Sequence, residues 1–211
     1  MPQSPKNIAL RVIAMEASAI SDLGLLIDDH FDKAIELLQN CRGRVVLSGI
    51  GKSSLIAQKI VATFNSTGTP SIFMHAADAL HGDLGIVQDE DVVIILSKSG
   101  NSPEIKALIP LIKNFGNKLI AISGNNQSLL ALQADVFLDT TVQQEACPNN
   151  LAPTTSTTAQ LVMGDALAVC LMELRGFKDG DFAKFHPGAL WGRNYTCAWP
   201  MFAPIMKSPQ Y

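Results

Sequence analysis

The sequence predicts an α/β protein built on a single doubly wound, five-stranded parallel sheet with helices on both faces. Five short apolar runs, separated by stretches of helical spacing, are typical of strands that are buried on both sides. The connections between them are long enough for the right-handed crossovers that parallel strands require. With 211 residues and 47% hydrophobic content, the chain can bury one core of ordinary size. We therefore expect a single domain.

Residues 1–43 are expected to form helices that precede the sheet. Apolar residues recur at helical spacing between residues 8 and 40, and a polar break at residues 28–30 divides them into two helices. Acidic side chains outnumber basic ones in this region. A DNA-binding helical head would need a basic face, so the composition argues against one.

Residues 44–175 are expected to form the α/β core, and residues 176–211 a C-terminal segment and tail. The predicted strands are residues 45–47, 72–74, 92–96, 119–122 and 136–138. Ligands of such open sheets bind beyond the carboxyl ends of the strands. This rule indicates three turns, at residues 48–54, 97–104 and 123–126.

The turn at residues 97–104 is the strongest candidate for a ligand site. Ser97, Ser99 and Ser102 bring three hydroxyls to a helix start, where backbone N–H groups are unpaired. Such a site suits an anion such as a phosphate ester. Glu104 would lie in the first helical turn, either as an acid or base beside the anion or only as a favourable charge on the helix dipole.

The turn at residues 48–54 is a second candidate. Its Gly-Lys-Ser triplet ends like a P-loop, but the first glycine of that motif is replaced by Val46. A dinucleotide site is also disfavoured, because no acidic residue ends the next strand. The glycines still allow close backbone approach to a ligand, and Lys52 and Ser53 open the following helix. The alternative is a tight turn with a solvated lysine.

Charge and cysteine content exclude several classes of partner. The net charge is −3 and the pI about 5.8, which gives no general attraction to nucleic acid or to an anionic membrane. The four cysteines lack C-x-x-C spacing and no signal pattern opens the chain, so reduced thiols in the cytoplasm are expected. The apolar stretch at residues 161–174 is too short for a bilayer, which needs about 20 residues, so no membrane segment is predicted.

Several motifs taken together resemble the sugar isomerase (SIS) domain family, in its arabinose 5-phosphate isomerase branch. They are Gly-Ile-Gly-Lys-Ser at residues 49–53, His-Gly-Asp-Leu-Gly at 81–85, the turn at 97–104, Leu-Ala-Pro-Thr-Thr-Ser-Thr-Thr at 151–158 and His-Pro-Gly at 186–188. The resemblance covers nearly the whole chain. It implies the flavodoxin-like SIS fold, with the C-terminal segment forming part of the active site.

The resemblance implies interconversion of D-arabinose 5-phosphate and D-ribulose 5-phosphate, which feeds synthesis of Kdo for lipopolysaccharide. By position, the implied phosphate ligands are Ser53, Ser97, Ser99 and Ser102. The implied polar active-site residues are Lys52, Glu104, Glu145 and His186, with His81 near the site. Family members form dimers or tetramers with sites close to subunit interfaces, so a homo-oligomer is implied.

Aldose–ketose isomerisation requires ring opening, proton transfer between C1 and C2, and stabilisation of an enediolate oxygen. His186 suits ring opening and proton relay, since imidazole titrates near neutrality. Glu145 is the first choice for the carboxylate that carries the proton, and Glu104 the second. Lys52 could neutralise the oxyanion or hold the phosphate. This route requires no cofactor and no metal, and the histidine spacing fits no usual metal site.

Other interpretations remain open at this stage. Glu145 could be a solvated loop carboxylate. The chain could be a different SIS isomerase, acting on a heptose or hexulose phosphate, or a non-catalytic sugar-phosphate sensor. Family enzymes commonly continue into a pair of CBS modules, whereas this sequence ends at Tyr211, so we expect a SIS-only form without nucleotide control. Asn101 replaces a common acidic residue of the family turn, which bears on substrate preference.

Overall fold

The computed structural model describes residues 4–187, and it begins with the predicted N-terminal helices. Helix α1 (Pro5–Leu23) is capped by Ser4, whose side chain accepts a hydrogen bond from the Asn7 backbone N–H. A short 3₁₀ turn, η1 (Gly24–Leu26), separates it from α2 (Asp29–Gln39). The prediction of two helices is confirmed, and the polar break contains the α2 cap, because the Asp28 carboxylate accepts from the His30 N–H.

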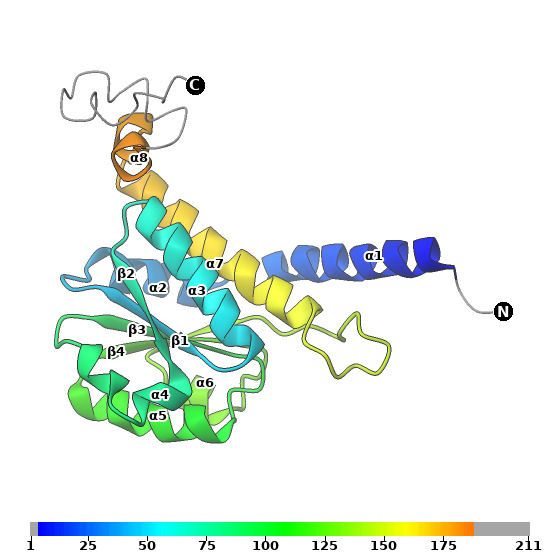
Figure 1. The fold of residues 1–211 in the computed structure, drawn as a ribbon, viewed down its shortest axis with the longest axis horizontal. Coiled ribbons are helices and arrows are strands. Elements are labelled where there is room, and N and C mark those ends of the chain that lie inside the picture. The colour runs from blue at the N-terminus through cyan, green and yellow to red at the C-terminus, as the bar shows by residue number, and fades with distance from the viewer. Residues whose placement is uncertain (1–3, 188–211) are drawn as a thin grey trace, which may run out of the picture.

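The predicted sheet is confirmed in its strand number, direction and class. It contains β1 (Val45–Gly49), β2 (Ser71–His75), β3 (Val92–Ser97), β4 (Lys118–Ser123) and β5 (Val136–Asp139). All pairs are parallel and the order is β2-β1-β3-β4-β5 (Figure 1). The strand order reverses between β1 and β3, which makes the turns that follow these neighbouring strands the expected ligand site.

Helices cover both faces because successive strand residues point to opposite sides. On one face lie α2, α3 (Lys52–Ser66) and α7 (Thr155–Leu174); on the other lie α4 (Ala76–Ala79), η2 (Asp83–Ile86), α5 (Pro103–Phe115) and α6 (Leu129–Gln133). In β1, Val45 and Leu47 belong to the first core, whereas Val46 belongs to the second. The strands are therefore apolar on both sides, as their continuous runs predict.

Helix α7 packs lengthwise against α3 and runs from the carboxyl ends of the strands toward their amino ends (Figure 1). A Cβ on Gly164 would overlap Ile60 of α3, so the two backbones approach closely at this point. At the far end, Arg175 donates to the carbonyl oxygen of Gly68 and to Thr69 Oγ1, just before β2 begins. Helix α7 thus ends at the amino edge of the sheet, and α8 (Asp179–Phe185) follows there.

Helix α7 starts before the apolar stretch identified in the sequence and is 20 residues long. Among residues 4–187 it is the one helix whose length and apolar composition would allow it to cross a membrane. In this fold its buried side chains, among them Met163, Leu167 and Leu171, pack into the core against α2, α3 and the sheet. Its place in the core thus accounts for part of its apolar character, since 39% of the segment is buried.

Candidate functional site at the carboxyl edge of the sheet

The two turns predicted to bind an anion lie side by side at the carboxyl edge. Strands β1 and β3 are neighbours, with Gly49 in register with Leu96, so the chain leaves both strands at the same place. The first turn leads to Lys52 and Ser53 on α3, and the second contains the serines of residues 97–102. The elements therefore bring the predicted phosphate ligands to one region.

The first turn depends on the backbone of Gly51. This residue has φ +59° and precedes α3 without any side-chain cap, a conformation that favours glycine. The first-turn N–H groups of α3 consequently have no side chain competing for them. Lys52 is exposed, and Ser53 is half-buried and donates its hydroxyl proton to Gln160 Oε1 on α7 at 3.1 Å.

The second turn holds its hydroxyls in place with backbone donors. Ser97 Oγ accepts from the Gly100 N–H at 3.1 Å, and Ser99 Oγ accepts from the Asn101 N–H at 3.3 Å. Each hydroxyl therefore retains its proton for an external acceptor. Ser102 occupies the N-cap position of α5 without a capping hydrogen bond, and its buried Oγ has no hydrogen-bond partner within the described residues.

The conformation of this second turn depends on Gly100. Its φ is +62°, and a Cβ at this position would overlap the side chain of Ser128, which caps α6. The turn is thus packed directly against the neighbouring β4–α6 connection. Asn101 adds a contact to the same connection, because its Oδ1 accepts from the Leu129 N–H at 3.1 Å.

Glu145 lies in the loop after β5 and its side chain is fully buried. Its Oε2 accepts from the backbone N–H groups of Thr154 and Ser156 at 2.8 and 3.2 Å, which are the first unpaired donors of α7. Its Oε1 accepts from the Ser156 hydroxyl and lies 2.6 Å from Lys98 Nζ. The carboxylate therefore joins the start of α7 to the turn at residues 97–102.

The environment of Glu145 sets its protonation state. Burial by itself would raise its pKa, but the hydrogen bonds from Lys98, Ser156 and Thr154 outweigh burial and lower the pKa from 4.5 to about 2. A carboxylate with such a pKa is anionic throughout the neutral range and is a weak base. Glu104, by contrast, is half-buried in the first turn of α5 and forms no ion pair or side-chain hydrogen bond within residues 4–187.

The two predicted histidines lie in different places. His81 is exposed in the turn after α4, on the carboxyl side of the edge strand β2. His186 directly follows α8, with its ring stacked on Phe182 at a centroid distance of 3.8 Å. Phe185 stacks on Phe177, which lies against Gly68 at the amino edge. Within one chain, His186 is therefore separated from Glu145 by the length of α7, about 30 Å at 1.5 Å per residue.

Sequence reasoning missed Lys98 and Gln160. Lys98 lies inside the turn at residues 97–104, but its ion-pair partner Glu145 is 47 residues away in the sequence, and no local pattern connects the two residues. Gln160 is a fully buried polar residue on an apolar helix, a signal that the sequence does carry. No cluster of three or more metal-ligating side chains occurs within residues 4–187.

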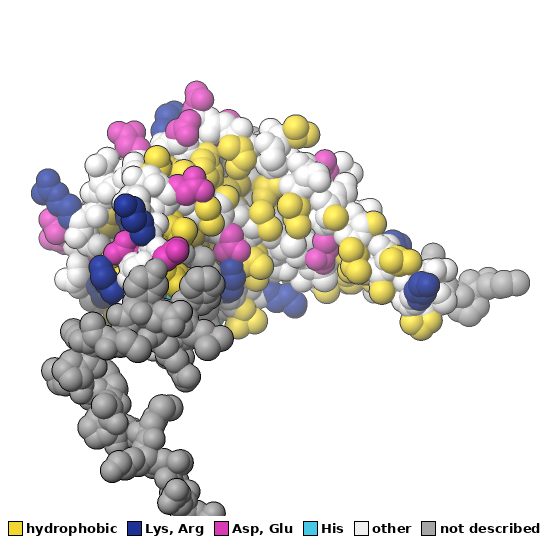
Figure 2. Space-filling model, turned by 90° about the horizontal axis from the view of Figure 1, so that it is seen from above, with side chains coloured by type: hydrophobic (Ala, Val, Ile, Leu, Met, Phe, Trp, Pro, Cys, Tyr) yellow, Lys and Arg dark blue, Asp and Glu magenta, His cyan; other side chains and the backbone are white. Residues whose placement is uncertain are grey.

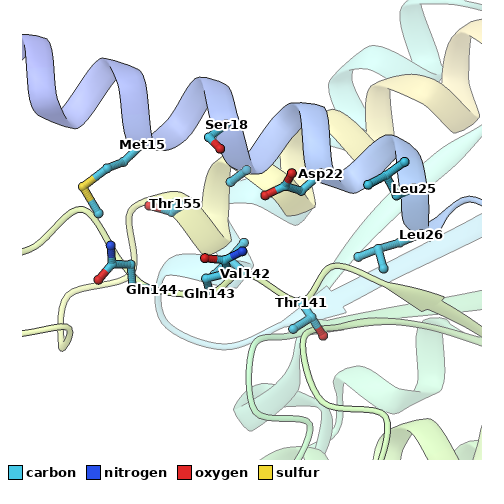
Figure 3. Close-up of a pocket in the computed structure, with 11 residues that line it drawn as sticks. Met15, Ser18, Asp22, Leu25, Leu26, Thr141, Val142, Gln143, Gln144 and Thr155 are labelled. Carbon is cyan, nitrogen blue, oxygen red and sulfur yellow. The ribbon is translucent and has the colours of Figure 1, made fainter.

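A cavity of about 410 Å³ lies beside this region rather than in it (Figure 3). It separates α1 from the loop after β5, and none of the predicted phosphate ligands lines it. Met15, Ser18 and Asp22 face it from α1, Leu25 faces it from η1, and Thr141 to Gln144 face it from the loop. Thr155, which also accepts from the Ala146 N–H, connects it to the surroundings of Glu145.

Comparison with known proteins identifies related sequences and structures. The SIS domain family model matches residues 37–170. The probable arabinose 5-phosphate isomerase of Haemophilus influenzae is 51% identical over 191 residues, covering 90% of this chain and 57% of its own. The arabinose 5-phosphate isomerase KdsD of Pseudomonas aeruginosa is 54% identical over 185 residues, covering 88% and 57%. The chain thus spans 57% of the length of these two curated relatives.

Solved structures share the fold. A protein of Escherichia coli CFT073 in complex with A5P superposes with a TM-score of 0.84 at 42% identity, covering 88% of this chain and all of the other. A putative sugar-phosphate isomerase of Listeria monocytogenes gives a TM-score of 0.85 at 35% identity, covering 89% and 100%.

Proposed function

The chain belongs to the SIS domain family, and on that premise we propose that it is an aldose–ketose isomerase which interconverts D-arabinose 5-phosphate and D-ribulose 5-phosphate. The observation that carries the proposal is the pair of hydroxyl-rich turns at the carboxyl edge, in a chain 51–54% identical to proteins named for that reaction. A role in supplying Kdo for lipopolysaccharide belongs to the same proposal.

Ser53, Ser97, Ser99 and Ser102 would hold the substrate phosphate. Ser97 and Ser99 have protons to donate, because both accept from the backbone, and the starts of α3 and α5 add N–H groups. Lys52, exposed at the start of α3, would neutralise either the phosphate or the enediolate oxygen. Together these groups supply donors and positive charge without an arginine.

Glu104 fits the role of the proton-carrying base better than Glu145 does. Proton transfer between C1 and C2 needs a carboxylate that is accessible and basic enough to accept the proton. The Glu145 carboxylate is buried, fully hydrogen-bonded and has a pKa of about 2. We therefore assign Glu145 a positioning role, holding the start of α7 and Lys98, and assign the proton transfer to Glu104.

His186 can reach such a site only from a second copy of the chain in this arrangement, because it lies at the opposite edge of its own sheet. The proposal therefore includes a homo-oligomer in which His186 of one copy serves the carboxyl edge of another, for ring opening and proton relay. His81, on the exposed rim of the same edge, would contact the substrate or the neighbouring copy.

Helix α1 supports the assembly. Along the projecting arm that it forms, Ile8, Leu10 and Ile13 are 41%, 56% and 65% exposed, and hydrophobic side chains continue from the body onto this arm (Figure 2). Only Leu23, at its end, is buried among the residues of α1. Covering this face with a second copy would remove apolar surface from water.

The remaining features agree with a cytoplasmic enzyme that binds neither nucleic acid nor membrane. Cys41, Cys147 and Cys170 are free thiols, and Cys197 lies outside the described residues. The net charge of −3 provides no attraction to nucleic acid. The single-domain organisation over residues 1–211, with an active-site segment from residue 176, is part of the same proposal.

Incubation with ribulose 5-phosphate in deuterated water tests the function. Transfer through an enediolate places deuterium at C2 of the arabinose 5-phosphate formed, which NMR detects. Absence of product at high enzyme concentration would remove the isomerase proposal. Product from a heptose or hexulose phosphate instead would reassign the substrate, and phosphate binding without turnover would indicate a sensor.

Two variants test the assigned roles. His186→Ala should abolish turnover while phosphate binding is retained, whereas Ser99→Ala should mainly raise KM. Normal turnover in both would refute the site assignment.

A further inference from the structure

Gln160 forms an unusual contact behind the phosphate region. It lies on α7, is 1% exposed, and faces the first turn of α3. Its Oε1 accepts the hydroxyl proton of Ser53 at 3.1 Å, while its Nε2 is buried with no hydrogen-bond partner in the described residues. A buried amide nitrogen without an acceptor is unfavourable, and an apolar side chain would fill the same space without that loss.

The direction of this hydrogen bond conflicts with phosphate binding. A phosphate monoester presents oxygens that accept hydrogen bonds. Ser53 has a single hydroxyl proton, and donation to Gln160 leaves none for a phosphate oxygen. Ser97 and Ser99 show the opposite arrangement, since both accept from the backbone and keep their protons.

Reversal of the Gln160 amide resolves the conflict of direction. Rotation by about 180° exchanges oxygen and nitrogen, which have nearly the same size. Nε2 would then donate to Ser53 Oγ, and Ser53 would donate its proton to the phosphate. The buried nitrogen then gains an acceptor, and the oxygen takes the place without a partner. Each donor strengthens the next along the chain of hydrogen bonds.

We propose that Gln160 is a positioning residue of the phosphate subsite, whose amide orients the Ser53 hydroxyl proton toward a bound phosphate ester. The inference rests on the proposed function in that the ligand is a phosphate monoester. It adds a residue that does not touch the substrate and acts through Ser53.

Calorimetric binding of inorganic phosphate and steady-state kinetics with arabinose 5-phosphate test it in two variants. Gln160→Glu can only accept, so it retains the Ser53 proton, and Kd and KM should rise about tenfold or more, with kcat changed less than about threefold. Gln160→Met donates nothing and accepts only weakly, so Kd should rise only about threefold. Gln58→Glu, which adds the same charge on the exposed face of α3, is the matched control and should leave Kd unchanged.

A double-mutant cycle separates orientation of the proton from simple charge repulsion. In the S53A background, Gln160→Glu should change the phosphate Kd less than about twofold, because no proton remains to be oriented. An equal loss in both backgrounds would overturn the proposal, as would a wild-type protein that does not bind phosphate. Should Gln160→Glu fail to fold, the same cycle with Gln160→Met applies, and lack of coupling there overturns it.

The experiment also distinguishes this inference from the proposed function. Phosphate binding with coupling between Gln160 and Ser53, but without isomerisation, would refute the function and leave the inference standing. Isomerisation without coupling between Gln160 and Ser53 would refute the inference and leave the proposed function standing.

Discussion

Under the proposed function, Glu145 holds the candidate site in place without itself transferring the proton. Its oxygens accept from two backbone N–H groups of α7 and from Ser156, and its charge is paired with Lys98. Removing one partner of a buried ionic group leaves the remaining charge desolvated, which costs more than the pair contributes. Loss of activity on mutation of Glu145 would therefore report disturbed geometry as readily as lost chemistry.

Stability should depend on pH through Glu145. Its pKa is lowered in the folded protein, so the stabilisation is fully present above pH 4.5 and is lost as the pH falls toward 2. The difference from 4.5 to about 2 corresponds to about 3 kcal/mol. Urea unfolding at pH 7, 4 and 3 should show this decline, and Glu145→Gln should lack it. An equal decline in Glu145→Gln would mean that other groups govern acid unfolding.

Lys98 should be the partner that keeps Glu145 ionised. Lys98→Met is expected to lower the free energy of unfolding by about 1–3 kcal/mol at pH 7, discounted because the lysine is 44% exposed. The acid decline should also become smaller and end at a higher pH, since loss of the Lys98 hydrogen bond brings the folded-state pKa of Glu145 back toward 4.5. Denaturation with urea at several pH values measures both effects.

Lys106→Met is the matched control for Lys98→Met. Lys106 is exposed on α5 and forms no ion pair within residues 4–187. Its variant should stay within about 0.5 kcal/mol of the wild type at every pH. If Lys98→Met and Lys106→Met had the same free energy of unfolding at every pH, the ion pair between Lys98 and Glu145 would contribute nothing to stability.

At the level of elements, the close packing of α3 and α7 positions the candidate site, because each helix contributes a residue to it. Ser53 lies on α3 and Gln160 on α7, so the distance between the helices determines the length of the hydrogen bond between these two side chains. Gly164 permits this distance, because any side chain there would meet Ile60. The spacing of the helices is thus a property of the site as well as of the core.

Gly164→Ala should therefore destabilise the protein by about 1–3 kcal/mol, through overpacking against Ile60. Gly180→Ala provides the contrast, because a Cβ at Gly180 in α8 meets no atom within 4 Å. That variant should gain up to about 1 kcal/mol from helix propensity. Thermal unfolding of both variants checks the prediction, and equal melting temperatures would contradict it.

The sequence predicted the elements well because their signals are local. Continuous apolar runs located all five strands, and the polar break marked the cap of α2. The pairing of Lys98 with Glu145 could not be predicted, because it depends on where the loop after β5 folds back. The separation of His186 from the carboxyl edge likewise depends on the path of α7 across the whole sheet.

At the level of the whole molecule, the proposed site requires two copies of the chain. The serine turns and Glu104 lie at one edge of the sheet, and His186 lies beyond the other. In a two-fold pair, each copy can give His186 to its partner and receive one in return. The exposed apolar residues of α1 offer surface for such a contact.

Complementation between inactive variants tests the shared site. His186→Ala and Glu104→Gln should each be inactive alone. Subunit exchange between them creates mixed pairs in which one site of two has both groups, so about a quarter of wild-type activity should return. No recovery, with exchange verified by native mass spectrometry, would place His186 and Glu104 in the same copy or outside the chemistry.

Disruption of α1 tests the proposed contact separately. Ile13→Asp places a charge on an exposed apolar position, so it should leave the fold intact and shift the protein to monomers. Light scattering after size exclusion measures the mass, and circular dichroism verifies folding. An unchanged mass would show that α1 lies outside the contact.

The glycine conformations of the two turns constrain any attempt to engineer the proposed phosphate site. At Gly51 and Gly100 the backbone adopts positive φ, and at Gly100 there is no room beside Ser128 even for a methyl group. A library that varies the side chains of Ser99 or Lys52 would sample new ligands on an intact frame. A library that varies the glycines would mostly contain variants whose turns cannot adopt the required backbone conformation. Selection for a new ligand should therefore hold both glycines fixed.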